Sequence, residues 1–121
     1  MLREPFRVDV IRDRNTLARM VEDGRIENVY RLQVMNVTEA RHHYEVTVKD
    51  LPGAVAISRG PLELGAAESR WWPVAVQIPP EAAAKLGSGS HRVEFEIRQL
   101  PDPAAPEGAQ VEEHSTFIVP R

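Results

Sequence analysis

Trp72-Pro-Val-Ala-Val-Gln-Ile78 places large apolar residues at every second position and smaller or polar residues between them. Successive side chains of a β-strand point to opposite faces of a sheet, so this stretch predicts a strand with one buried face. Five more stretches have the same period of two, and a weaker one covers residues 54–57. The five are residues 6–10, 30–34, 44–48, 93–97 and 116–119. About seven short strands predict an all-β fold, an immunoglobulin-like sandwich of two antiparallel sheets.

Turn-forming residues separate the predicted strands and provide the positive or fixed φ that a chain reversal needs. They are Asp23-Gly24, Leu51-Pro-Gly53, Gly60-Pro61, Gly65 and Gly87-Ser-Gly-Ser90. Two segments depart from the strand pattern: residues 15–22 space their apolar residues as a helix does, and residues 79–86 begin with two prolines and end before a glycine. We expect one or two helical turns in the first. We expect a single turn in the second, crossing from one sheet to the other.

The length of 121 residues predicts one domain, residues 1–121, whose core is large enough to be stable without disulfides. The chain has no cysteine, which excludes disulfides, a thiol nucleophile and iron–sulfur ligation by these residues. The net charge of −3 arises after residue 100, because acidic and basic groups balance before it. Without a basic field we expect no nucleic-acid binding. Without an apolar run of about 20 residues we expect no direct membrane insertion by this domain.

Residues for catalysis do not occur in the familiar patterns. No serine lies in a Gly-x-Ser-x-Gly turn, and Gly87-Ser-Gly-Ser90 lacks the lysine and the following helix of a phosphate-binding loop. We therefore expect no catalytic residue and no bound cofactor in this chain, so that this domain is not an enzyme.

Four histidines are the candidate metal ligands: His42, His43, His91 and His114. In an extended strand the adjacent His42 and His43 point to opposite faces, so both cannot bind one ion. We expect these two at a solvated loop edge, as weak candidates for a metal site. Together with Met20 and Met35, the histidines support an alternative function, a module that handles copper, because imidazole and thioether ligands suit that metal.

The paired tryptophans require separate interpretations. Trp72 is in phase with Val74, Val76 and Ile78, so we expect it in the core. Trp71 then lies on the outer face, where it either covers a sheet edge or anchors a protein partner. A carbohydrate-binding role for Trp71 is a weaker alternative, because no row of aromatic residues accompanies it.

Three motifs in the first third of the chain carry a family resemblance: Val8-Asp-Val-Ile-Arg-Asp-Arg-Asn15, Gly24-Arg-Ile-Glu-Asn-Val-Tyr30 and Leu32-Gln-Val-Met-Asn36. With the closing Ser115-Thr-Phe-Ile-Val-Pro120, they resemble the C-terminal domain of the FixG/CcoG (RdxA) family. These are accessory proteins for cbb3-type cytochrome c oxidase. The resemblance extends over essentially the whole chain and implies an immunoglobulin-like fold.

The resemblance also implies a setting for this domain. It would be the C-terminal piece of a larger bacterial membrane protein whose cysteine-rich part holds two [4Fe–4S] clusters and is associated with copper reduction. It would lie on the periplasmic side of the inner membrane, tethered through that parent protein. The partners implied are proteins, namely the rest of the parent chain and components of oxidase assembly. The cofactors of the family cannot be assigned to any residue here, because the chain has no cysteine.

Arg12-Asp13-Arg14-Asn15 permits two interpretations. Arg12 and Arg14 are candidate contacts to an assembly partner, or the segment forms a polar network at the turn into the next strand. Asn28 and Asn36 flank that strand, where asparagine side chains commonly bind local backbone.

The segment 101–113 is predicted to be a long proline-rich loop between the last two strands. Asp102 and Glu107 are candidate partner contacts within it. The loop is either a tolerated insertion or an acidic arm that meets a basic surface. The leading hypothesis is a non-catalytic interaction or scaffold domain of a cbb3 oxidase assembly protein.

Overall fold

Alternation along the chain produces nine strands in the part that the computed structural model describes, residues 5–12, 18–103 and 105–120. The strands are β1 (Phe6–Arg12), β2 (Arg19–Met20), β3 (Ile26–Asn36), β4 (His42–Lys49), β5 (Val55–Ser58), β6 (Leu62–Leu64), β7 (Ser69–Ile78), β8 (Gly89–Gln99) and β9 (Ala109–Val119). A 3-10 turn, η1 (Glu22–Gly24), and one helix, α1 (Pro80–Leu86), complete the described elements.

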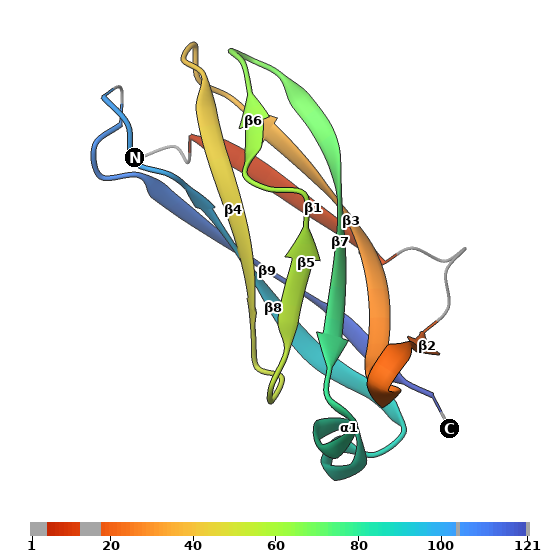
Figure 1. The fold of residues 1–121 in the computed structure, drawn as a ribbon. Helices are drawn as coiled ribbons and strands as arrows, with labels where there is room; N and C mark the ends of the chain where they lie inside the picture. The colour runs from red at the N-terminus through yellow and green to blue at the C-terminus, as the bar shows by residue number, and fades with distance from the viewer. Residues whose placement is uncertain (1–4, 13–17, 104, 121) are drawn as a thin grey trace.

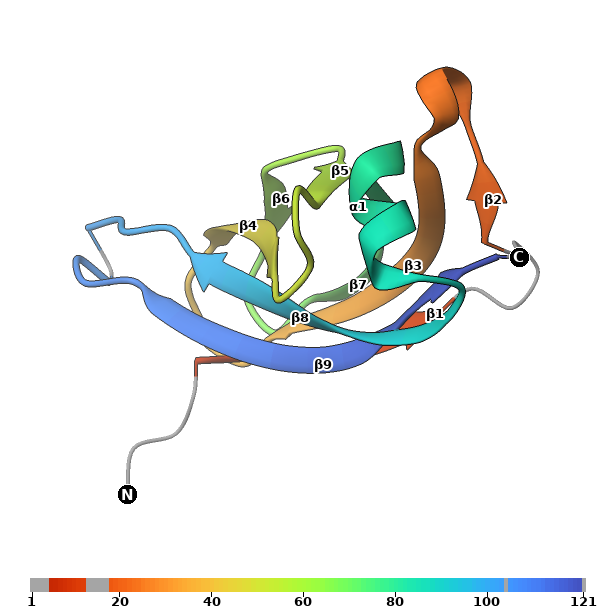
Figure 2. The same cartoon turned by 90° about the horizontal axis from the view of Figure 1, so that it is seen from below.

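The strands form two antiparallel sheets that pack face to face (Figures 1 and 2). In the first, called sheet A, the order is β1-β3-β7-β5, and β2 continues the edge of β3 beyond β1. In the second, called sheet B, the order is β6-β4-β8-β9. The immunoglobulin-like sandwich predicted from the alternation is therefore confirmed.

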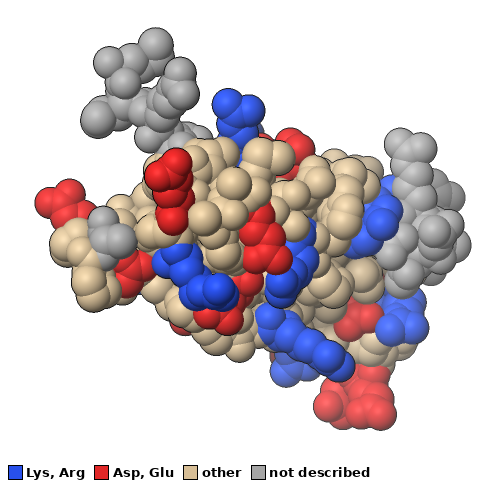
Figure 3. Space-filling model, turned by 90° about the horizontal axis from the view of Figure 1, so that it is seen from above, with Lys and Arg blue, Asp and Glu red and all other residues tan. Residues whose placement is uncertain are grey.

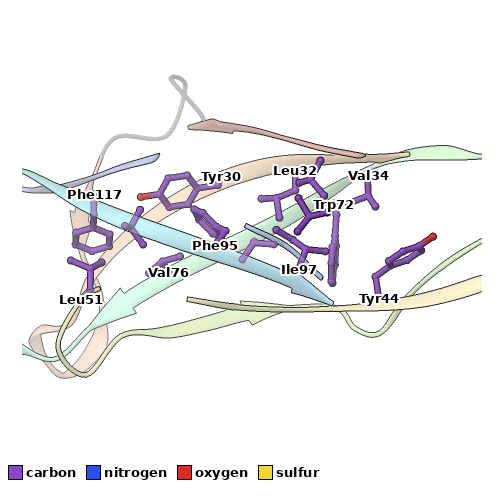
Figure 4. Packing of buried hydrophobic residues seen from close by; sticks show 14 of the residues in the cluster. Tyr30, Leu32, Val34, Tyr44, Leu51, Trp72, Val76, Phe95, Ile97 and Phe117 are labelled. Carbon is purple, nitrogen blue, oxygen red and sulfur yellow. The ribbon is translucent and has the colours of Figure 1, made fainter. Parts of the chain in front are cut away.

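The core lies between the sheets, where the inward residues of both interdigitate (Figure 4). The rings of Tyr30 and Phe95, from opposite sheets, meet edge to face with their centroids 4.9 Å apart. Those of Phe6 and Tyr44 lie 5.0 Å apart. The inward phase predicted for the strands is confirmed, and its fully buried members include Tyr30, Leu32, Val34, Val74, Val76, Val93, Phe95, Ile97 and Phe117.

Helix α1 joins β7 of sheet A to β8 of sheet B at one end of the sandwich, as predicted (Figure 1). Pro80 begins it, where a missing N–H is harmless, and the buried Ala82 faces the core. Gly87, at φ +81°, ends it and donates its N–H to the Ala83 carbonyl over 2.9 Å.

Two sequence expectations about secondary structure are wrong. The helical turns expected in residues 15–22 are wrong for Arg19 and Met20, which pair with Glu27 and Ile26 as β2; of the described residues in that range, only Glu22 is in a helical turn, where it begins η1. Met20 is 69% exposed, so the apolar spacing does not correspond to a buried face there. The sequence pattern does not predict strand β6, since Gly60-Pro61 and Gly65 leave too few residues between them for a visible period.

Candidate functional site

Asn28 and Tyr30 connect the two sheets through β9. The Asn28 amide donates to the Ile118 carbonyl and accepts from the Ile118 N–H, each over 2.9 Å. The Tyr30 hydroxyl donates to the Thr116 carbonyl over 2.7 Å. The expectation that Asn28 binds local backbone is therefore wrong. Its side chain, from the opposite sheet, makes the two backbone hydrogen bonds of Ile118 that a neighbouring strand would otherwise make at this edge of β9.

Asn36, at the end of β3, does bind local backbone as expected. Its amide donates to the Ala40 and Gly65 carbonyls over 2.8 and 2.9 Å. Its side-chain oxygen accepts from the N–H and the hydroxyl of Thr38 over 3.0 and 2.7 Å. Asn28 and Asn36 thus link β3, near its two ends, to other parts of the sandwich.

The arginine-rich motif is only partly within the described residues. Arg12 ends β1 and lines a surface hollow of about 310 Å³ between β1 and β9, with Val10, Ile11, Ser115 and Thr116. Asp13, Arg14 and Asn15 lie outside the described residues. The partner-contact prediction for Arg12 and Arg14 therefore stays a prediction.

His42 and His43 lie on opposite faces of β4, but the solvated loop edge expected for both is wrong for His42. Its ring is buried at 2% exposure, and its Nδ1 lies 2.7 Å from the Asp102 carboxylate. His43 is exposed on the outer face of sheet B, 3.5 Å from the Glu63 carboxylate. The sequence signal for His42 was its phase, since it alternates in step with the buried Tyr44.

The loop predicted at 101–113 is shorter than expected, because β9 begins at Ala109 and includes Glu112 and Glu113. The connection that remains is bonded to the body of the domain. Leu100 donates its N–H to the His43 carbonyl over 2.8 Å. Asp102 accepts the Ala105 N–H over 2.9 Å besides its contact with His42. Asp102 therefore anchors the loop, whereas Glu107 is exposed and stays a candidate contact.

Tyr44 belongs to the same end of the sandwich. Burial, with a smaller contribution from the Asp102 carboxylate, raises the pKa of Tyr44 to about 12. Within the described part of the chain, its hydroxyl and the Gln99 side-chain oxygen are buried without a hydrogen-bond partner. Tyr30 differs, because its hydroxyl is bonded; burial raises its pKa far above the usual tyrosine value, with Arg12 opposing the rise slightly.

The copper-ligand candidates are distributed over the molecule. His91 is bonded to the Gly87 carbonyl over 2.8 Å, and His114 to the Glu94 carboxylate over 2.6 Å. Met20, on β2, pairs with Ile26 at the start of β3, whereas Met35 lies near the end of β3 and pairs with Arg7 of β1. The two methionines are therefore at opposite ends of β3. Among the described residues, no three His, Asp or Glu side chains are grouped so that they could hold a metal ion.

Trp72 is in the core, as predicted, and donates its indole N–H to the Arg59 carbonyl over 3.0 Å. Trp71 is 43% exposed on the outer face of sheet A. The Arg31 guanidinium lies over its ring, 5.2 Å from the centroid. Tryptophan and arginine are both among the residue types enriched at the hot spots of protein interfaces.

The outer faces of the two sheets differ in chemistry. Outward positions of sheet B carry alternating charges, among them Glu45, Lys49, Glu94, Glu96, Arg98 and Glu112. Lys49 pairs with Glu96, and hydrogen bonds from Glu112 and His114 lower the pKa of Glu94. Outward positions of sheet A carry a patch that we call the apolar face: Ile11, Val29, Val55, Ile57, Trp71 and Pro73. On the surface seen in Figure 3, basic and acidic residues are interspersed.

These features define a class, a small immunoglobulin-like sandwich whose polar motif residues bridge its sheets. The match to a family is equally direct. Residues 1–120 match the family described as "IG-like fold at C-terminal of FixG, putative oxidoreductase", and the chain belongs to this family. Among the described residues, no helix has the length and apolar character needed to cross a membrane.

Solved structures agree with this assignment. A FixG-related protein from Vibrio parahaemolyticus is 29% identical, with a TM-score of 0.75 over 95% of this chain and 96% of that one. A protein from Archaeoglobus fulgidus (13% identity, TM-score 0.51) matches over 93% of this chain and 94% of its own. Escherichia coli alpha-2-macroglobulin, activated by porcine elastase (17% identity, TM-score 0.51), matches over 96% of this chain and 9% of its own. The last two show the fold alone. No curated protein sequence gives a significant match.

Proposed function

We propose that this chain is a non-catalytic interaction domain of a FixG-type accessory protein in the assembly of cbb3-type cytochrome c oxidase. The [4Fe–4S] clusters of such a protein would be held by its cysteine-rich part, because this chain has no cysteine. Any oxidation or reduction would then occur outside this domain.

The observation that carries the proposal is how the polar groups are used. Asn28, Tyr30, His42 and Asp102, which could have served chemistry, are each engaged in contacts that join strands or anchor a loop. Such contacts stabilise the fold, and in the part of the chain that the structure describes they occupy polar groups that catalysis would otherwise use. What the domain offers outward is sheet surface, including the exposed Trp71.

The partners in this proposal are proteins: the rest of the parent membrane protein and components of oxidase assembly. The domain would act on the periplasmic side of the inner membrane, tethered through its parent. An alkaline phosphatase fusion after Arg121 tests this location, because that reporter needs an oxidising compartment for its disulfides. An active fusion supports the periplasmic side, and a stable but inactive fusion contradicts it.

Deletion of the domain from the full-length FixG-type protein tests its role. We expect the membrane level and cluster content of the truncated parent to persist while cbb3 oxidase activity falls. A parent protein that keeps normal oxidase activity without this domain would contradict the proposal.

A further inference from the structure

The outer face of sheet A exposes several large apolar side chains to solvent. Ile11, Val55, Ile57 and Trp71 are between 42% and 49% exposed. Register places them side by side: Ile57 pairs with Ala75, which pairs with Val29, while Pro73 and Trp71 continue along β7. The outer face of sheet B, built by the same alternation, is charged instead. One sheet is therefore suited to solvent and the other to a protein surface.

Arg31, one of the outward cations of this face, forms no ion pair with a carboxylate among the described residues. Glu27, the partly buried acid of the same face, is engaged by Arg19 over 3.0 Å and by Gln77 over 2.8 Å. The Glu68 carboxylate, near the other end of sheet A, forms an ion pair with Arg70 at 2.7 Å. Arg31 is stacked on Trp71 and is exposed on the outer face of sheet A. Guanidinium groups at interfaces bind carboxylates in a bidentate manner.

A second copy of the chain does not satisfy this face. Two copies related by a two-fold axis through its centre would bring Arg31 toward Arg31, and like charges brought together at an interface oppose association. Arg7 is a second outward cation on this face and Asp9 is an exposed carboxylate there, so each copy would bring more positive than negative charge to such a dimer.

We propose that the apolar face docks a protein segment that has apolar side chains flanking an aspartate or glutamate, with the carboxylate placed on Arg31. Trp71 provides the flat apolar contact beneath it, and Ile57 and Val55 extend the contact toward the β5 edge. The inference rests on the proposed function and names the surface and the chemistry of its partner.

Site-specific photo-crosslinking in the full-length FixG-type protein, in its own membranes, tests the inference. A benzophenone amino acid is placed at Ile57 or Ile11 on the apolar face, and at Thr47 on the outer face of sheet B as a control. We expect crosslinks from the two apolar-face positions to a protein segment that contains an acidic residue, with none from Thr47. Arg31→Glu should lower their yield by roughly tenfold or more, as expected when an interface hot spot is removed. The matched reversal Arg98→Glu, on sheet B, should leave it unchanged.

Several results would overturn the inference: no crosslink from the apolar face, equal crosslinks from Thr47, crosslinks to lipid or to a second copy, or a mapped segment without an acid. A yield that does not respond to Arg31→Glu would also overturn it. Purified 121-residue variants provide the folding control, because the core of this chain is self-contained and a solved FixG-related structure matches it over 96% of its own length. If deletion of the domain impairs the oxidase but these crosslinks fail, the proposed function survives and the docking surface does not.

Discussion

Asn28 and Ile118 are joined by two hydrogen bonds of 2.9 Å although 90 residues separate them in sequence. One side-chain amide on β3 of sheet A thereby replaces the backbone neighbour that an edge strand of sheet B lacks. Tyr30, two residues further on, repeats the connection at Thr116. The closure of the sandwich thus explains Asn28 and Tyr30 of the segment Gly24–Tyr30.

Asn28→Ala should lower the free energy of unfolding by about 2–4 kcal/mol. The substitution removes two hydrogen bonds and leaves the N–H and the carbonyl of Ile118 unsatisfied in a partly buried place. Urea denaturation followed by tryptophan fluorescence measures the change. Gln33→Ala, outward on the same strand, is the control and should stay within about 0.5 kcal/mol. Equal effects of the two substitutions would contradict the bridge.

The two buried tyrosines should respond differently to loss of the hydroxyl. Tyr30→Phe removes a 2.7 Å bond and leaves the Thr116 carbonyl unpaired, so we expect a loss of about 1 kcal/mol. Tyr44→Phe removes a hydroxyl that has no partner among the described residues, so stability should be unchanged or slightly higher. Thermal melts of both variants measure this difference, and a larger loss at Tyr44 would show that its hydroxyl is bonded.

Stability should fall in alkali because of the same two residues. Burial raises the folded-state pKa of both tyrosines above the ordinary value of 10.0, and the pKa of Tyr44 is raised to about 12. Their contribution is therefore complete below pH 10 and is lost as the pH rises through the folded pKa. Between about pH 10 and 12 the unfolded chain binds fewer protons, so the free energy of unfolding should decrease by about 1.4 kcal/mol per pH unit for each tyrosine. The double phenylalanine variant should lose most of this slope; an unchanged slope would assign it to other groups.

Substitutions of Asp102 and Glu107 should distinguish the anchoring of the loop from the effect of its surface charge. Asp102→Ala breaks the contacts to His42 and to the Ala105 N–H, so we expect a loss of about 1–3 kcal/mol and faster hydrogen exchange at the Ala105 amide. Glu107→Ala, at an exposed position of the same loop, should change neither. Identical exchange in both variants would mean that Asp102 does not hold the loop.

The adjacent tryptophans test the register of β7. Trp72→Ala should cost about 3–5 kcal/mol through lost burial, a cavity and the unpaired Arg59 carbonyl. Trp71→Ala, on the outer face, should cost under about 1 kcal/mol. Chemical denaturation followed by far-ultraviolet circular dichroism measures both, and a reversed order would place the strand one residue out of register.

The period of two predicted most of the fold, because Trp72, Val74 and Val76 report a buried face directly. The same period also marks polar residues for burial. Asn28 is in step with Tyr30, and His42 with Tyr44, so both were marked for burial by position. Their partners could not be predicted, since Ile118 and Asp102 are brought to them only by the packing of one sheet on the other.

Local propensity was misleading where tertiary pairing prevailed. Met20 has helical spacing to its neighbours, but Arg19 binds Glu27 and pairing with β3 sets the local backbone. The apolar face was visible only as the single outward Trp71, because Ile11, Ile57 and Pro73 come from three strands whose order the sequence does not state.

The most direct test of the central claim is cbb3 oxidase activity in membranes that contain full-length FixG-type protein with Arg31→Glu. Parent abundance and the melting temperature of the purified 121-residue variant are measured alongside. We predict that activity falls while abundance and fold are unchanged, and that Arg98→Glu, the same charge reversal on sheet B, leaves activity normal. Normal oxidase activity with Arg31→Glu, or an equal loss with Arg98→Glu, would contradict a domain that acts through the apolar face of sheet A.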